Sequence, residues 1–74
     1  MMPMQYLVIV EKSENGFGAY VPDLPGCAAA AETRDEVVSL IQEAIEFHID
    51  GLKRSGEPIP IPKSQSELID VHAA

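Results

Sequence analysis

One long amphipathic helix is the feature that most constrains the fold of this chain. Apolar residues after Thr33 recur at intervals of three and four, which places them on one face of a helix of about five turns. Thr33 and Glu36 have the spacing of a capping box, and Gly56 suits the left-handed residue that follows a helix. We therefore predict a helix over Arg34–Arg54 that buries its apolar stripe against another element. The stripe consists of Val38, Ile41, Ile45, Ile49 and Leu52, with Val37, Ala44 and His48 at its margins.

The residues that precede this helix predict a β-hairpin. Tyr6–Val10 is rich in β-branched and aromatic residues, which favour a strand. The Asn15–Gly16 pair is typical of a tight hairpin turn, and Phe17–Val21 alternates as a return strand would. The first strand is apolar on both faces, so we expect a second cover besides the helix.

A third strand is predicted between the hairpin and the helix. Pro22 ends the return strand because proline cannot donate to a ladder, and Pro25–Gly26 favours a type II turn. We predict a strand over Cys27–Glu32, whose small side chains would let the helix approach the sheet closely.

The chain after the helix alternates proline with other residues. Glu57–Pro62 predicts an extended, polyproline-like connector with Ile59 and Ile61 as apolar anchors. Beyond it, Leu68–His72 favours a short fourth strand, with a single helical turn opened by Ser66 as the alternative. The prediction for residues 1–74 is a single α+β domain with the element order β-β-β-α-β.

Net charge limits the partners that we expect. The chain has 5 Lys and Arg against 12 Asp and Glu, a net charge of −7 over 74 residues. This excess disfavours nucleic acid and anionic membranes as partners, because both attract basic surfaces. The hydrophobic fraction of 46% favours a folded core. A single cysteine and the lack of a long apolar run predict a cytoplasmic protein that binds no membrane.

No residue pattern in the chain predicts catalysis. A nucleophilic Cys27 would need a base, and the only histidines are His48 and His72. Paired Cys/His spacings that hold zinc are absent from the sequence. We expect His48 at the helix margin, Cys27 as a small buried hydrophobe, and no enzyme activity, cofactor or metal.

The order of these motifs resembles the HicB-like antitoxin domain from Tyr6 to about Val71. The resemblance is carried by a hexapeptide, by the capping box that follows it, and by the Gly56–Pro60 exit from the helix. The hexapeptide and the box consist of Pro22, Asp23, Leu24, Pro25, Gly26, Cys27, Thr33 and Glu36. The resemblance implies a partial ribonuclease-H-like fold with three antiparallel strands, one helix and a short fourth strand.

The resemblance also implies a partner. HicB-like antitoxins bind a small basic HicA-like toxin, an mRNA-cleaving ribonuclease whose catalytic histidine the antitoxin occludes. Many of them carry an additional DNA-binding segment; because this sequence ends at Ala74 without one, we expect no direct DNA binding by this chain. The alternative hypothesis is an orphan oligomeric scaffold, or a small-ligand-binding domain of the same fold, without a toxin.

Self-association is the last expectation from the sequence. A three-stranded sheet with one helix leaves one face uncovered, and an apolar face of this kind usually marks an interface. We predict a homodimer or a dimer of dimers. The predicted contact residues are Tyr6, Val8, Tyr20, Ile59 and Ile61.

Overall fold

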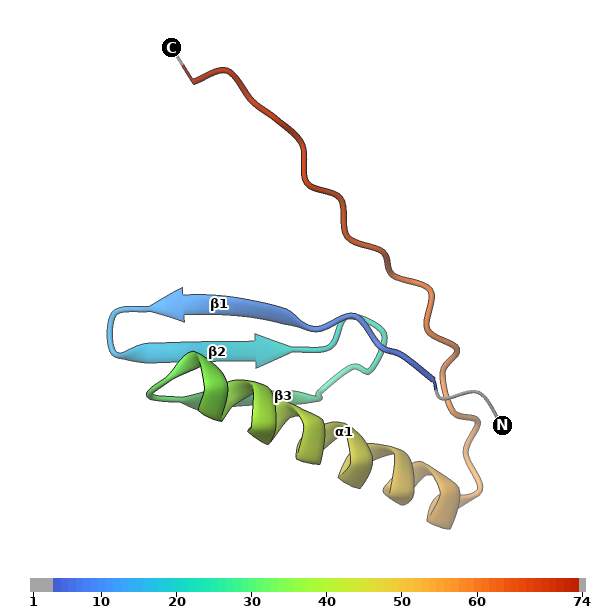
Figure 1. Ribbon diagram of the computed structural model, residues 1–74. Helices are drawn as coiled ribbons and strands as arrows, with labels where there is room; N and C mark the ends of the chain where they lie inside the picture. Colours follow the sequence, from blue (N-terminus) through green and yellow to red (C-terminus); the bar gives the residue numbers. More distant parts are fainter. Residues whose placement is uncertain (1–3, 74) are drawn as a thin grey trace.

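The protein folds as a three-stranded antiparallel sheet with one long helix on one face. The computed structural model describes residues 4–73. The strands are β1 (Ile9–Ser13), β2 (Gly16–Tyr20) and β3 (Ala28–Ala31), arranged in the order β1-β2-β3. The helix α1 (Arg34–Ser55) follows β3 and lies along the sheet (Figure 1). The predicted α+β class, with three antiparallel strands and one helix, is confirmed.

The hairpin is shifted along the chain relative to the prediction. The two turn residues are 14 and 15, whereas Gly16 already pairs with Ser13 as the first residue of β2. A side chain at Gly16 would collide with the carbonyl oxygen of Ala31, which explains the glycine at this position. β1 begins at Ile9 and not at Tyr6, because Ile9 already faces Tyr20, the last residue of β2.

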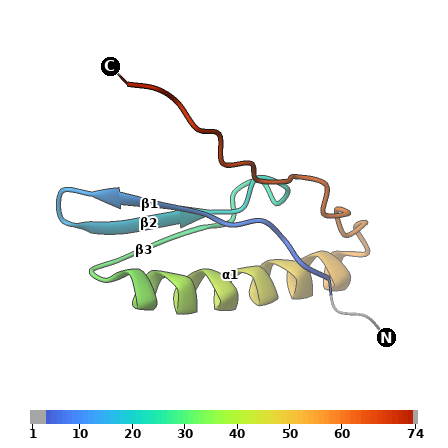
Figure 2. The ribbon, with the colours of Figure 1, turned by 45° about the horizontal axis from the view of Figure 1, so that its top comes forward.

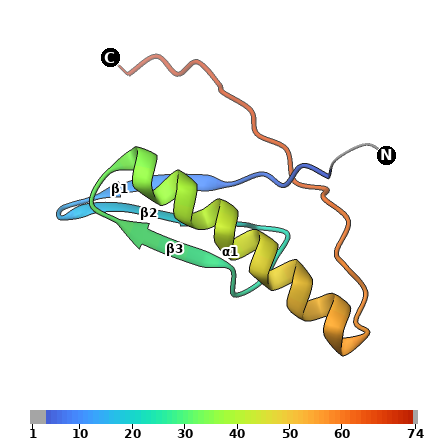
Figure 3. The ribbon, with the colours of Figure 1, turned by 60° about the horizontal axis from the view of Figure 1, so that its bottom comes forward.

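The core lies between the helix and the sheet face that it covers, and Figures 2 and 3 show this two-layer arrangement. The small side chains of β3 pack against this core, as the sequence predicts. Within the helix, Val37 is fully buried whereas Val38 is 38% exposed, so the buried stripe begins at Val37 and not at Val38. The later stripe residues Ile41, Ile45, Ile49 and Leu52 are buried or half-buried, as predicted. The fully or almost fully buried residues are Ala19, Val21, Leu24, Cys27, Val37 and Ile41.

Both predicted helix caps form. The Thr33 hydroxyl accepts a hydrogen bond from the Glu36 backbone N–H at 3.1 Å and donates one to the Glu36 carboxylate at 2.9 Å. At the other end, Gly56 takes a left-handed conformation with φ of 71°, which lets its N–H and that of Glu57 reach the last carbonyls. Acidic residues in the first turn and basic residues in the last complement the helix dipole.

The predicted fourth strand does not form. Residues 57–73 run as an extended segment without a ladder, and the end of this segment leads away from the sheet (Figure 1). Leu68 is 99% exposed, and Ile69 and Val71 are also largely exposed. A strand needs an edge that supplies hydrogen-bond partners, and this segment departs from the sheet before it reaches one. The alternative, a helical turn after Ser66, does not form either.

Candidate protein-binding surfaces

The hexapeptide motif builds the turn between β2 and β3. The Cys27 N–H donates to the Leu24 carbonyl at 3.1 Å, and Gly26 has a φ of 85°, as the predicted type II turn requires. Further bonds join Val21 N–H to Cys27 and Leu24 N–H to Val21. Leu24 is 0% exposed, so the motif contributes a core side chain as well as a turn.

Asp23 in the same turn fixes the connector that follows the helix. Its carboxylate accepts hydrogen bonds from the backbone N–H groups of Lys63 at 2.9 Å and Ser64 at 2.8 Å, and from the Ser64 hydroxyl at 2.8 Å. These bonds lower the pKa of Asp23 below its ordinary value, with the Ser64 N–H making the largest contribution. The Tyr6 hydroxyl donates to the Pro60 carbonyl in the same region. Partial burial, and to a lesser extent the negative charge of Asp23, raise the pKa of Tyr6.

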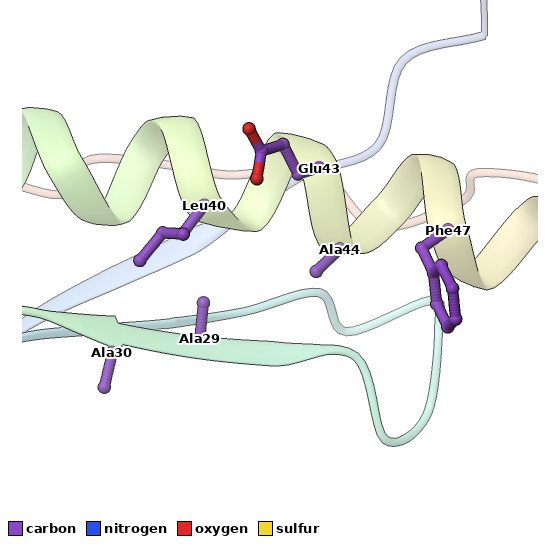
Figure 4. A pocket seen from close by; sticks show the side chains of 6 residues that line it. All are labelled: Ala29, Ala30, Leu40, Glu43, Ala44 and Phe47. Carbon is purple, nitrogen blue, oxygen red and sulfur yellow. The ribbon is translucent and has the colours of Figure 1, made fainter.

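An open apolar groove runs between α1 and β3, and we call it the β3 groove. Figure 4 shows Ala29 pointing from the strand toward the helix, while Leu40, Ala44 and Phe47 border the groove from the helix. Phe47 is 82% exposed and Leu40 is 42% exposed. Exposed apolar side chains that adjoin one another, rather than lying scattered, are typical of a protein-binding surface. The groove is lined by Ala29, Ala30, Leu40, Glu43, Ala44 and Phe47.

The helix side of this groove carries a row of carboxylates. Glu43 lines the groove itself. Glu36 and Asp50 lie seven residues before and after Glu43, so two turns of helix separate each from it on the same side. Asp50 is bound to Arg54 at 3.0 Å in an exposed ion pair, whereas Glu36 belongs to the capping box. The groove therefore combines an apolar floor with an acidic border.

The sheet face opposite the helix is mostly apolar but includes the carboxylate of Glu11. Ile9, Tyr20 and Ala28 are paired across the three strands, so their side chains share this face. Glu11, Gly18 and Ala30 are paired beside them, and Tyr20 is 43% exposed. We call these six residues the open sheet face.

The five residues predicted from the sequence as oligomer contacts do not form one surface. Tyr6 and Val8 are half-buried against the chain's own core, on the side that the helix covers. Ile59 is half-buried in the connector, whereas Ile61 is exposed. Tyr20 alone of the five lies on the open sheet face.

Sequence reasoning missed Leu40 and Phe47. Both lie outside the apolar stripe that defined the helix, so they were not assigned to any surface. Their spacing could have indicated a second apolar surface on the helix. Leu40, Ala44 and Phe47 are separated by four and three residues, which places all three on one side of the helix. Which strand lies beside that face depends on how the helix packs, and the sequence pattern does not contain that information.

The candidates for chemistry are the thiol of Cys27 and any cluster of side chains that could hold a metal ion. Cys27 is buried in the core, as predicted, and its burial raises the pKa of the thiol. Within residues 4–73, no three His, Cys, Asp or Glu side chains gather in a way that could hold a metal ion. No helix in the described part of the chain is long and apolar enough to cross a membrane.

The sequence was compared with protein families and with known proteins, and it matches one family over most of its length. A family described as "HicB_like antitoxin of bacterial toxin-antitoxin system" matches residues 6–73. A UPF0150 protein of Thermoplasma acidophilum is 42% identical over 71 residues, which cover 95% of this chain and 100% of that protein. "Antitoxin HicB 2" of Photorhabdus laumondii is 30% identical over 72 residues, and the match covers 96% of this chain but only 52% of that antitoxin.

A solved structure shares the fold. A chain of the "HicA3 and HicB3 toxin-antitoxin complex" superposes with a TM-score of 0.68 at 35% sequence identity. The match covers 80% of this chain and 70% of that chain. The hexapeptide turn, the capped helix and the three-stranded sheet all lie within the range matched by the family. The chain therefore belongs to the HicB-like antitoxin family of bacterial toxin–antitoxin systems.

Proposed function

We propose that this protein is an antitoxin that binds a small basic HicA-like toxin and blocks its cleavage of mRNA. The observation that carries the proposal is the likeness, at 35% identity and a TM-score of 0.68, to a chain of a HicA–HicB toxin–antitoxin complex. The match of the antitoxin family to residues 6–73 supports the same function.

The charge of the chain supports a basic partner. A net charge of −7 on 74 residues gives an attractive field for a basic protein, which speeds encounter and orients it. The acidic border of the β3 groove concentrates part of this charge beside exposed apolar side chains. A surface of this kind suits a partner that binds RNA through basic residues. The basic residues that contact RNA phosphates can instead form ion pairs with the carboxylates of this protein.

In this proposal the protein acts by binding and not by catalysis. Its single thiol is buried, and burial raises the pKa of that thiol, which disfavours the thiolate that a nucleophile needs. Inhibition then requires that the antitoxin cover the toxin's RNA-binding or catalytic surface in a stable complex.

We also propose that the protein self-associates through the open sheet face, as a dimer or a dimer of dimers. Tyr20 is the contact residue that we propose on this face, because its side chain is exposed there, whereas Ile61 is exposed on the connector, outside this face. Two-fold pairing would cover the exposed Tyr20 and its apolar neighbours, which the helix leaves open.

The test is binding to the small basic protein encoded by the reading frame beside this gene. The candidate toxin is produced with its catalytic histidine replaced, and its dissociation constant and association rate are measured at several salt concentrations. We expect a stable complex whose association slows as salt rises, because exposed charges are screened over about 8 Å at physiological ionic strength. A neighbouring basic protein that does not bind, or the absence of such a frame, would favour the orphan scaffold instead.

A further inference from the structure

The β3 groove lies beside an outer edge of the sheet, the edge formed by β3. β3 is the last strand in the order β1-β2-β3, so its outer side has no strand partner among residues 4–73. In an antiparallel pair, alternate residues direct their N–H and C=O groups away from the partner strand. β3 therefore offers free backbone donors and acceptors directly beside exposed Leu40 and Phe47.

We propose that a segment of the toxin binds as an additional strand along the outer edge of β3. Alternate side chains of this segment would pack on Leu40, Ala44 and Phe47, and its basic side chains would face Glu36 and Glu43. Strand addition of this kind obtains affinity from main-chain hydrogen bonds and specificity from alternate side chains. The inference rests on the proposed function, because it takes its basic partner from there.

The dimensions of the groove fit a short strand. β3 has four residues, and at about 3.3 Å per residue it spans about 13 Å. Leu40 and Phe47 are seven residues apart on the helix, which corresponds to about 10 Å at 1.5 Å per residue. An added strand of four residues at about 3.3 Å per residue is about 13 Å long, so it spans the distance from Leu40 to Phe47.

The small residues of β3 leave room for such a strand. All four positions are alanine, so no long side chain of β3 covers the edge or fills the groove. Ala29 points into the groove, and Ala30 points to the other side of the sheet (Figure 4). Natural proteins usually protect an exposed edge by keeping it short or by placing charged residues, prolines or bulges on it. β3 is short, at four residues, but it carries no charged residue, proline or bulge.

Charge favours a basic toxin over a second copy of this chain as the occupant. Two copies paired edge to edge along β3 would bring their acidic borders together, including Glu32, which follows β3 directly. Like charges placed opposite each other oppose pairing, whereas basic side chains at the same positions would be attracted. The groove thus discriminates between the two partners by electrostatics.

A pair of charge reversals tests the position of the toxin. Glu43→Lys and Glu46→Lys change the net charge equally, but Glu43 lines the β3 groove, whereas Glu46 borders the other flank of the helix. We expect Glu43→Lys to weaken binding of the inactive toxin about tenfold or more, and Glu46→Lys to weaken it less than about threefold. Phe47→Ala should also weaken binding at least about tenfold, while Ile69→Ala, equally exposed in the C-terminal segment, should not.

Hydrogen exchange tests the mode of binding. The outward-facing amides of β3 should exchange readily in the free protein and become protected in the complex with the inactive toxin. Weakened binding by Phe47→Ala and Glu43→Lys without protection of the β3 amides would overturn strand addition. If both variants bind the toxin as tightly as the wild type, the toxin does not bind at the β3 groove. The proposed function would still stand in that case, because the wild-type protein binds the toxin. Lack of binding by the wild-type protein would instead contradict the function itself.

Discussion

Replacement of Leu24 by alanine tests whether the hexapeptide motif stabilises the fold through its buried side chain. Leu24 is 0% exposed and is the largest fully buried residue together with Val37. Loss of about three methylene equivalents at about 0.8 kcal/mol each removes about 2.4 kcal/mol of transfer free energy. The hydrogen-bonded turn around Leu24 prevents its neighbours from filling the space left by the side chain, so a cavity remains and adds to this loss. We expect a total loss of about 3 kcal/mol in the free energy of unfolding.

This loss is large for so small a protein. At about 0.05–0.15 kcal/mol per residue, a domain of this size has a free energy of unfolding of about 4–11 kcal/mol. A loss of 3 kcal/mol should lower the melting temperature by about 12–24 °C, since each kcal/mol corresponds to about 4–8 °C. Thermal and urea unfolding followed by circular dichroism measures both quantities.

Two other leucines in the chain serve as matched controls. Leu68→Ala removes the same atoms from a side chain that is 99% exposed, and Leu40→Ala removes them from one that is 42% exposed. We expect no measurable change for the first and less than about 1 kcal/mol for the second. A Leu24→Ala variant within 1 kcal/mol of the wild type, or a Leu68→Ala variant that is equally destabilised, would refute this assignment of the core.

Three further predictions address the helix cap at Thr33, the self-association, and the hydrogen bonds from Lys63 and Ser64 of the connector to Asp23, which we call the Asp23 clasp. Thr33→Ala should reduce the free energy of unfolding by about 1 kcal/mol, and Thr33→Ser should retain it; an unchanged urea midpoint in the alanine variant would remove the cap assignment. Because its hydrogen bonds lower the pKa of Asp23, the clasp on the connector should hold above the ordinary value of 3.8 and weaken as the pH falls through the lower, folded-state value. At neutral pH, Asp23→Ala should accelerate tryptic cleavage after Lys63, measured by mass spectrometry, and equal cleavage rates would contradict the clasp. Light scattering at micromolar concentration should give at least twice 8.0 kDa, with a lower mass for Tyr20→Glu; a wild-type mass of 8.0 kDa would exclude the proposed dimer.

Local chemistry explains which parts of the fold could be predicted from the sequence. The capping box, the left-handed Gly56 and the type II turn at Pro25–Gly26 each depend on residues within a few positions of one another. The strand limits depend instead on pairing, and β1 starts at Ile9 because the chain turns away after Tyr20, the residue opposite. An apolar composition at residues 68–72 favours a strand, but a strand forms only where an edge is within reach.

The candidate surface was harder to predict than the fold. The hexapeptide residues that carry the family resemblance build the turn, the core and the hydrogen bonds of Asp23 to the connector, and none of them lines the β3 groove. Of the motif residues, Glu36 alone lies in the row of carboxylates beside the groove. Leu40 and Phe47 acquire their significance only when α1 is placed over the sheet with β3 beside them. Such a juxtaposition is a property of packing, which no local motif encodes.

Inhibition of RNA cleavage tests the central claim most directly. The active basic protein from the neighbouring reading frame is incubated with RNA, and this protein is added in increasing amounts. We predict that cleavage stops once the antitoxin reaches a fixed stoichiometric ratio to the toxin, and that the antitoxin alone cleaves no RNA with or without Mg²⁺. Cleavage that continues at full rate with excess antitoxin, or robust metal-dependent cleavage by the antitoxin alone, would contradict the account.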